Sequence, residues 1–240
     1  MKFTYSIPTK ILFGPGSFND LATTPLPGKK ALVVITAGKS MRANGYLDRL
    51  IAMLDKQGIG HALFDKILPN PVLRHVHEGA ALAREQGCDF VIGLGGGSSI
   101  DSAKSIAVMA KNPGDYWDYI SGGSGKGQPL VNGALPIVAI ATTAGTGTEA
   151  DPWTVITKED TNEKIGFGCA ETFPVLSVVD PEMMLTIPAH LTAYQGFDAL
   201  FHATEGYIAN VATPLSDAYA LKSIELLAKY LPAAVKDGSD

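Results

Sequence analysis

The sequence predicts an α/β fold: a Rossmann-like, mainly parallel sheet domain followed by the start of an all-helical domain. Two patterns carry this prediction. Short apolar runs typical of buried strands alternate with helical segments from about residue 30, and the strand pattern stops after residue 179. The composition agrees, because 240 residues with 46% hydrophobic side chains can bury a substantial core.

The expected elements follow in order along the chain. Apolar runs at 30–36, 90–94, 137–140 and 175–179, with a shorter one at 62–64, predict strands, and 45–57, 72–86 and 98–110 have the apolar spacing of helices. Residues 4–6 and 11–13 are expected to pair as an edge hairpin, and 153–158 with 164–169 as a second one. The Gly-rich stretch 121–133 is expected to be a surface loop.

The switch to helical pattern near Pro188 predicts a domain boundary there. We therefore expect an α/β domain over 1–187 and the beginning of a helical domain over 188–240. So short a helical segment makes a thin domain, and we expect the chain to be incomplete.

Two helix starts are expected in this second part. Thr192 followed by Gln195 is typical of a capping box and predicts a helix over 192–209. Thr213 followed by Pro214 is typical of an N-cap with proline at the first helical position, so a second helix begins there.

Charge and composition exclude several classes of protein. The formal net charge of −5 argues against nucleic-acid binding, which requires a basic surface. Two cysteines do not make a disulfide scaffold, and no apolar run is long enough to span a membrane. The N-terminus lacks the apolar run of a signal peptide. We therefore expect no nucleic-acid or membrane partner and a cytoplasmic location.

The strongest local signal is a glycine cluster after a strand. The expected strand at 90–94 runs into Gly95, Gly96 and Gly97, and a helix is expected from Ser98. Glycine lets the backbone approach a phosphate, and the helix N-terminus offers free N–H groups and a partial positive charge. The pattern is neither G-x-G-x-x-G nor a P-loop. The plain alternative is a tight turn without a ligand. Asp101 lies in the first turn of this helix. Its negative charge either interacts favourably with the helix dipole, which is a structural role, or lies near the cofactor.

A second polar glycine loop follows the strand at 137–140. It contains Thr142, Thr143, Thr146 and two glycines at the carboxyl end of that strand, where ligands of open α/β sheets bind. Two such loops could hold one dinucleotide. A cluster of turn and capping residues without a ligand is the alternative.

An aspartate–histidine pair is the candidate metal site. Asp198 and His202 are four residues apart, so they share one face of the expected helix, and carboxylate with imidazole suits a divalent metal. The alternative is an ion pair on a helix surface. The apolar neighbours, such as Phe201, favour a buried helix. His75 and His77 are expected at the surface.

Five segments, in order across nearly the whole chain, resemble the iron-containing (group III) alcohol dehydrogenases. Their superfamily includes glycerol dehydrogenase and dehydroquinate synthase. The segments are FGPGS (13–17), GLGGGSSIDSAK (93–104), PIVAIATTAGTGTE (136–149), FPVLSVVDPEMM (173–184) and GFDALFHATEGY (196–207).

The resemblance implies that the domain over 1–187 binds a dinucleotide, that the domain beginning at 188 is a helical metal-binding domain, and that the metal lies between the two. It implies that the cofactor pyrophosphate is held by Gly95, Gly96, Gly97 and Ser98, with Asp101 near the nicotinamide side. It also implies that Thr142, Thr143 and Thr146 line the cofactor cleft and that Lys164 reaches the cofactor ribose. Asp198 and His202 would be catalytic as the first two metal ligands, Fe²⁺ being expected and Zn²⁺ the alternative.

The chain departs from the family in two respects. Family members take two further histidine ligands from a later helical segment, and this chain ends before it, so we expect weak metal binding by the chain alone. Many members have Thr-Gly where this chain has Gln195-Gly196. We expect little effect, since glutamine still caps the helix.

The turn after the first long strand bears on the choice of NAD or NADP. NAD enzymes usually place a carboxylate on the adenosine ribose. Here the strand ends in Thr36-Ala37 and continues with Gly38, Lys39 and Ser40, with no acid. These three are candidate cofactor residues, and a 2′-phosphate would be tolerated.

The expected function is reversible hydride transfer between a primary alcohol or aldehyde and NAD or NADP, by a homodimer or higher homo-oligomer. Two alternatives remain. One is an enzyme of the dehydroquinate synthase or glycerol dehydrogenase type, and the other is an inactive nucleotide-binding fragment.

Overall fold

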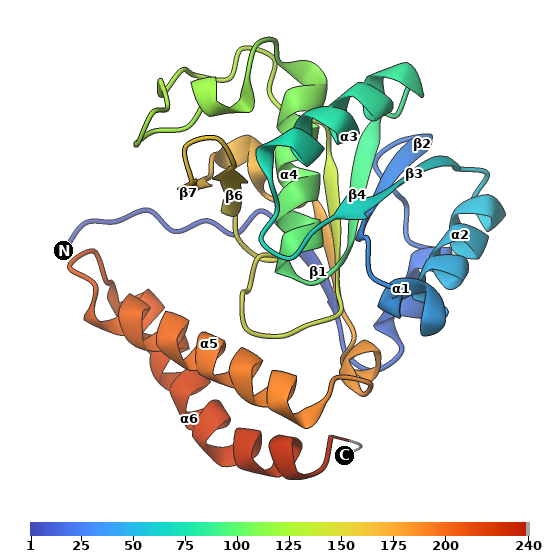
Figure 1. Cartoon of the computed structure of the whole chain (residues 1–240). Helices are drawn as coiled ribbons and strands as arrows, with labels where there is room; N and C mark the ends of the chain where they lie inside the picture. Colours follow the sequence, from blue (N-terminus) through green and yellow to red (C-terminus); the bar gives the residue numbers. More distant parts are fainter. Residues whose placement is uncertain (239–240) are drawn as a thin grey trace. The chain divides into compact units, whose positions relative to one another are not determined.

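The computed structural model describes residues 1–238, and the chain divides into two compact units (Figure 1). The sheet unit consists of 8–141 and 148–180. The helical unit consists of Met1–Ile7, Thr142–Gly147 and the chain from Pro181 onward. The domain boundary near Pro188 stays a prediction.

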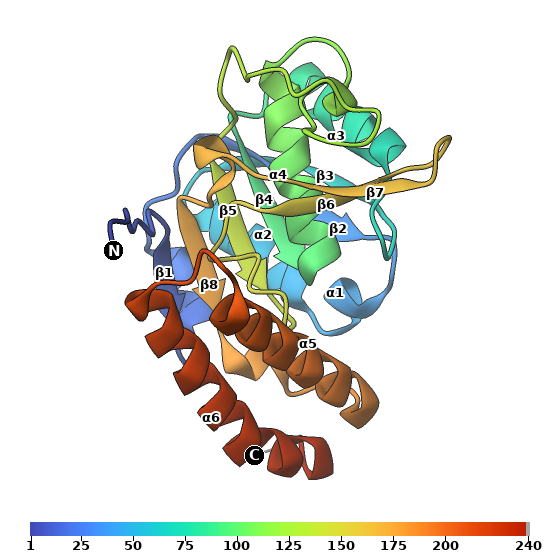
Figure 2. The same ribbon diagram turned by 90° about the vertical axis from the view of Figure 1, so that its left-hand side faces the viewer.

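A six-stranded sheet forms the centre of the sheet unit, and all its neighbouring strands are parallel. Its strands lie in the order β1-β8-β5-β4-β2-β3, and Figure 2 shows β1, β8 and β5 next to one another. The strands are β1 (Lys10–Phe13), β2 (Lys30–Thr36), β3 (Gly60–Ile67), β4 (Phe90–Gly95), β5 (Ile137–Ala141) and β8 (Leu176–Val179). The predicted mainly parallel α/β fold is confirmed, because fully apolar strands such as β4 are buried on both faces.

Four helices follow strands of this sheet; the last three were predicted, and the short first one was not. They are α1 (Ser40–Ala43), α2 (Tyr46–Lys56), α3 (Leu73–Glu85) and α4 (Gly97–Lys111). Leu32 and Val34 of β2 share a core cluster with Val76 of α3 and Ile106 of α4. The prediction that His75 lies at the surface is wrong: His75 is buried in α3, its ring edge-on to Phe64.

The expected N-terminal hairpin does not form. Residues 4–6 are not in a strand, and β1 pairs in parallel with β8 at the edge of the sheet. Pro8 lies between the two segments and has no N–H to donate to a ladder. The second hairpin is confirmed as antiparallel strands β6 (Thr154–Lys158) and β7 (Glu163–Phe167).

The Gly-rich stretch 121–133 is a loop, as predicted, and it is tied to the β6–β7 hairpin. Glu163 accepts hydrogen bonds from the main-chain N–H of Ser124 at 2.6 Å and from the hydroxyl groups of Ser124 and Thr161. These bonds lower the pKa of Glu163 to about 2.

Two antiparallel-packed helices dominate the helical unit, α5 (Ala189–Ile208) and α6 (Pro214–Lys236), and they lie along each other in both views (Figures 1 and 2). The predicted start at Thr213 is confirmed, because its hydroxyl accepts from the Ser216 N–H at 3.1 Å. The predicted capping box at Thr192 is wrong. The chain enters α5 one turn earlier, after Pro188, and the Thr192 hydroxyl donates back to the Pro188 carbonyl.

The expectation that α5 is buried is also wrong for this chain. Gly196, which accommodates Leu231 of α6, is its one buried residue, while Phe201 is 62% exposed. Within its unit the helix packs on α6 along one face, so its apolar residues on other faces remain open. No helix among the described residues has the length and apolar character needed to cross a membrane.

Candidate functional site

The glycine turn between β4 and α4 has the shape expected of an anion cradle. Gly95 has a φ of +142°, and a Cβ there would lie 2.6 Å from the Oγ of Ser99, so a side chain is excluded. The turn leads directly into the first turn of α4, where main-chain N–H groups point out of the helix end.

A buried hydroxyl under this turn supports the same interpretation. Ser99 is fully buried, and its Oγ has no hydrogen-bond partner among the described residues. Buried hydroxyl groups are nearly always satisfied, so this one marks a place where a bound group would complete the bonding. The residues present are thus compatible with a bound phosphate, which stays a prediction.

The turn after β2 lies at the same edge of the sheet. β2 and β4 are parallel neighbours, so Gly38, Lys39 and Ser40 follow β2 at the edge where Gly95 follows β4. All three are exposed, and no carboxylate accompanies them between 36 and 40. Cations and hydroxyls are thus the only charged or polar side chains in that turn.

Lys164 reaches this edge from the β6–β7 hairpin. Its Nζ donates to Asn70 Oδ1 at 2.8 Å, and Asn70 follows β3, the neighbour of β2. The hairpin is held there by the Thr157 N–H, which donates to the Pro71 carbonyl at 2.8 Å. Asn70 was not a predicted site residue. Its positive φ of 57° is the only unusual feature, and the sequence does not display it.

Asp101 lies in α4 but faces the protein interior. Its carboxylate accepts from the Thr148 hydroxyl at 2.7 Å and from the Val155 N–H at 2.9 Å. Burial raises the pKa of Asp101, and these two hydrogen bonds oppose that rise. Both carboxylate oxygens therefore have protein partners.

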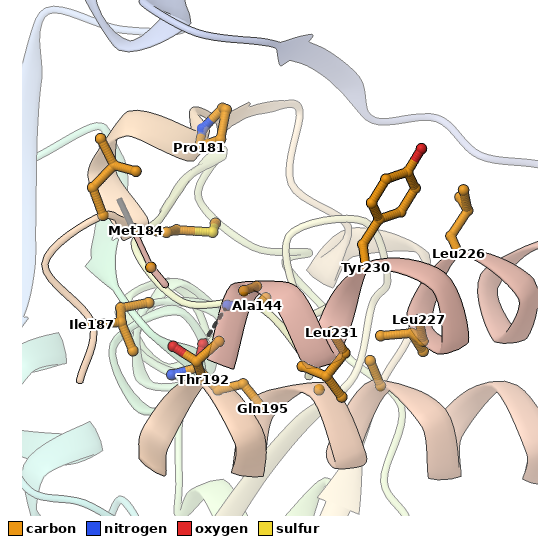
Figure 3. Close-up of a pocket in the computed structure, with 15 residues that line it drawn as sticks. Ala144, Pro181, Met184, Ile187, Thr192, Gln195, Leu226, Leu227, Tyr230 and Leu231 are labelled. Atoms are coloured by element: carbon orange, nitrogen blue, oxygen red, sulfur yellow. Dashed lines mark hydrogen bonds between the residues drawn. The ribbon is translucent and has the colours of Figure 1, made fainter. Parts of the chain in front are cut away.

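In the helical unit, the threonine loop (Thr142–Gly147) packs on α5. The Ala144 N–H donates to Gln195 Oε1 at 2.8 Å, the dashed bond in Figure 3. Gln195 thus bonds the loop and does not cap the helix, which corrects its predicted role. Gly145 has a φ of +104°, and a Cβ there would lie 2.8 Å from Asp198 Oδ2. The loop that carries Thr142, Thr143 and Thr146 therefore lies against Asp198.

Asp198 and His202 share one face of α5, as their spacing predicts. Asp198 Oδ1 lies 3.5 Å from His202 Nε2, and the side chains are 46% and 58% exposed. Among residues 1–238, no group of three or more His, Cys, Asp or Glu side chains gathers in a metal-binding arrangement. The pair offers one carboxylate and one imidazole, which suit a divalent cation but make only part of a coordination shell.

An apolar pocket lies beside the threonine loop within the helical unit (Figure 3). Its volume is about 390 Å³, and it extends from Ala144 and Gln195 between α5 and α6 to Met184 and Tyr230. Its walls are mostly hydrocarbon, so the pocket offers a water-poor surface next to the loop.

Comparison with known proteins agrees with these features. The family described as iron-containing alcohol dehydrogenase matches residues 8–181, and its C-terminal family matches residues 192–240. A choline dehydrogenase of Bacillus subtilis is 40% identical over 99% of this chain, which covers 58% of that protein.

Two solved structures are similar over the whole of this chain. The NADH-dependent butanol dehydrogenase A of Thermotoga maritima has a TM-score of 0.91 at 33% identity, with 59% of that protein covered. The sulfoacetaldehyde reductase of Bifidobacterium kashiwanohense, in complex with NAD⁺, has a TM-score of 0.89 at 31% identity, with 62% covered. The chain thus spans about three-fifths of the length of the relatives it matches.

Proposed function

The chain belongs to the iron-containing alcohol dehydrogenase family, and on that premise we propose that it serves reversible hydride transfer between a primary alcohol or aldehyde and a nicotinamide dinucleotide. The observation that carries the proposal is the packing of the threonine loop on Asp198. The loop follows β5 directly, at the edge of the sheet where nucleotides bind, and Asp198 is a candidate metal ligand. This contact supports the proposal, because the loop proposed to bind the cofactor lies against the proposed metal ligand.

Gly95, Gly96, Gly97 and Ser98 would hold the pyrophosphate through main-chain N–H groups and the positive end of α4. Thr142, Thr143 and Thr146 would contact the cofactor through their hydroxyl groups, and Lys164 its ribose. Gly38, Lys39 and Ser40 would face the adenosine ribose. Two similar proteins are described with NADH or NAD⁺. Because no carboxylate follows β2, we propose that this chain also accepts NADPH.

Asp198 and His202 would supply two donors to Fe²⁺, or to Zn²⁺. The metal, when bound, acts as a Lewis acid that lowers the pKa of an alcohol hydroxyl. Asp198 and His202 would hold that metal from one face of α5, next to the threonine loop. The substrate would be a small alcohol or aldehyde, and the apolar pocket beside the loop would exclude water from that side.

Cofactor binding tests the first half of the proposal. The fluorescence of NADH and of NADPH is titrated with the full chain and with the Gly95→Ala and Gly60→Ala variants. We expect both cofactors to bind and Gly95→Ala to abolish binding, because its Cβ collides with Ser99. Gly60→Ala is the matched strand control, since its Cβ would meet nothing closer than the Lys30 side chain, at 3.4 Å. Binding of NADH alone would contradict the dual-cofactor proposal.

Metal binding tests the second half. Co²⁺, Fe²⁺ and Zn²⁺ uptake is measured by calorimetry and, for Co²⁺, by absorption spectroscopy on His202→Ala and His190→Ala. His190 lies in the first turn of the same helix, with its ring edge-on to Tyr194, and serves as the control. We expect His202→Ala alone to lose uptake. Equal metal uptake by the two variants would refute the assignment of His202 as a metal ligand. Cofactor binding with neither metal uptake nor alcohol oxidation would favour a nucleotide-binding module without enzyme activity.

Assembly and location complete the proposal. We propose a cytoplasmic homodimer or higher homo-oligomer without nucleic-acid or membrane partners. Light scattering after size-exclusion chromatography measures the mass directly. A monomer at micromolar concentration would contradict the proposed assembly.

A further inference from the structure

One glutamine side chain ties the threonine loop to α5. The main-chain N–H of Ala144 donates to Gln195 Oε1 at 2.8 Å, and Figure 3 shows the two residues facing each other at the edge of the apolar pocket. Ala144 is exposed, and its N–H donates to no main-chain carbonyl among the described residues. The amide oxygen of Gln195 therefore accepts from an N–H that would otherwise bond to water.

The next residue of the loop touches the same turn of α5. A Cβ on Gly145 would lie 2.8 Å from the main-chain carbonyl oxygen of Gln195 and 2.8 Å from Asp198 Oδ2. Gly145 also has a φ of +104°, which glycine adopts readily and other residues do not. A hydrogen bond and a close contact thus fall on two consecutive loop residues, and Gln195 takes part in both.

Neither α5 nor the apolar pocket requires an amide at this position. Gln195 lines the pocket, whose walls are mostly hydrocarbon, and leucine forms helices as well as glutamine does. Within residues 1–238, the Ala144 N–H is the one group that bonds the Gln195 side chain. The amide oxygen therefore contributes to the placement of the loop rather than to the helix.

We infer that Gln195 is a positioning residue for cofactor binding, which acts by holding the Ala144 N–H and with it the threonine loop against Asp198; this inference rests on the proposed function. The loop contains Gly145 and Gly147, both with positive φ, and glycines increase the number of conformations open to a loop once it is released. Holding the loop in place before binding reduces the conformational entropy lost when the cofactor binds.

The experiment uses full-length proteins and three measurements. They are the exchange rate of the Ala144 amide proton by NMR, the NADH dissociation constant by fluorescence, and the thermal midpoint. Gln195→Leu removes the acceptor, whereas Gln195→Glu keeps an acceptor oxygen at the same place. Gly145→Ala pushes the loop away from α5 without a change to Gln195, and it is also combined with Gln195→Leu.

Thr192→Val is the matched control. Thr192 lines the same pocket one turn earlier on α5, and its hydroxyl donates to the Pro188 carbonyl at 3.4 Å. The substitution therefore removes a polar group from the same helix and the same pocket, but it leaves the bond between Gln195 and Ala144 in place. The amide exchange and the NADH dissociation constant of this variant should equal those of the wild type.

We expect Gln195→Leu to speed exchange of the Ala144 amide by about twofold to twelvefold, the population change that follows from the loss of one net hydrogen bond. The NADH dissociation constant should rise by about twofold or more, but by no more than the exchange rate does. Affinity falls only with the fraction of molecules whose loop is detached. The thermal midpoint should stay within about 2 °C of the wild type, since the helix and the pocket tolerate leucine.

Two variants test whether the hydrogen bond itself is responsible. Gln195→Glu should keep the Ala144 amide as slowly exchanging as in the wild type, because a carboxylate oxygen accepts the same bond. Gly145→Ala combined with Gln195→Leu should bind NADH no more weakly than Gly145→Ala alone, because the first change has already detached the loop. If Gly145→Ala does not fold, the comparison of Gln195→Leu with Thr192→Val decides.

The outcomes that overturn the inference differ from the one that overturns the proposed function. If the wild type binds NADH and Gln195→Leu binds it equally well, or if Thr192→Val weakens binding as much, Gln195 has no positioning role and the proposed function stands. Weaker binding by Gln195→Leu with unchanged Ala144 exchange, or additive effects in the double variant, would also overturn the inference. If the wild type binds neither NADH nor NADPH, the proposed function fails, and the positioning role fails with it.

Discussion

Replacement of Gly93 by alanine gives a quantitative test of how closely α4 packs on the sheet. Gly93 lies inside β4, and a Cβ there would lie 2.9 Å from the Cα of Ile100 and 3.0 Å from the Cβ of Ala103. Carbon atoms prefer a separation of about 3.5 to 4.0 Å, so the helix must move away by roughly 0.5 to 1 Å. The main chain of Ile100 cannot rotate out of the way as a side chain could.

Overpacking of this kind costs about 1 to 3 kcal/mol of the free energy of unfolding. For a domain of this size each kcal/mol lowers the thermal midpoint by about 2 to 4 °C, so Gly93→Ala should lower it by about 2 to 12 °C. Urea unfolding followed by fluorescence measures the same loss, because Trp117 lies in the core cluster that includes α4.

Gly60→Ala is the matched control, since both glycines lie in strands of the same sheet. Its Cβ meets the Lys30 side chain at 3.4 Å, and that side chain can move. The variant should be neutral or gain about 0.4 to 1 kcal/mol from the reduced entropy of its unfolded chain. Equal urea midpoints for the two variants would refute the packing argument.

Three further predictions concern other parts of the chain. Thr213→Ala should lower the free energy of unfolding by about 1 kcal/mol, because it removes the N-cap of α6, whereas Thr192→Ala, inside α5, should change it little. Circular dichroism during thermal unfolding compares the two variants, and equal effects would contradict the assignment of Thr213 as a cap. Glu163 has a folded pKa of about 2 against an ordinary value of 4.5, so its anchoring of the Gly-rich loop is complete above pH 4.5 and is lost as the pH falls through about 2. Glu163→Gln should therefore speed tryptic cleavage after Lys126 at neutral pH, and an unchanged rate would refute the anchor. Burial raises the pKa of the Cys88 thiol, so its alkylation at pH 7.5 should be slower than that of free cysteine. Mass spectrometry measures the two alkylation rates, and equal rates would show that the thiol is accessible to the reagent.

The sheet could be predicted from sequence because its strands are buried on both faces. Each of β2, β4 and β5 is a continuous apolar run, and few other structures require that pattern. The glycine turn was predictable because its glycines follow directly after the apolar run that forms β4. The edge strand β1 is less apolar, and the sequence did not disclose that its partner is β8, more than 160 residues away in the chain.

The remaining features depend on contacts that leave no local pattern. Thr192 and Gln195 have the spacing of a capping box, but the chain becomes helical earlier, and Gln195 bonds Ala144 of a distant loop. The apolar residues of α5 suggested burial, yet burial depends on what packs against a helix and not on its composition alone. Lys164 could be placed in a hairpin, while its bond to Asn70 could not be foreseen.

Lys104 shows why the choice between a plain turn and a nucleotide site needed the structure. In the sequence it is a lysine three residues after an aspartate, the spacing of an ordinary ion pair on an exposed helix. The structure buries it and satisfies its ammonium group completely, whereas the Ser99 hydroxyl a turn and a half earlier has no partner among the described residues. Leaving a buried hydroxyl unbonded costs about 1 to 3 kcal/mol, so a phosphate at the glycine turn is one group that could complete the bonding once the turn adjusts to it. That contrast, within one helix, favours the phosphate interpretation of the glycine turn.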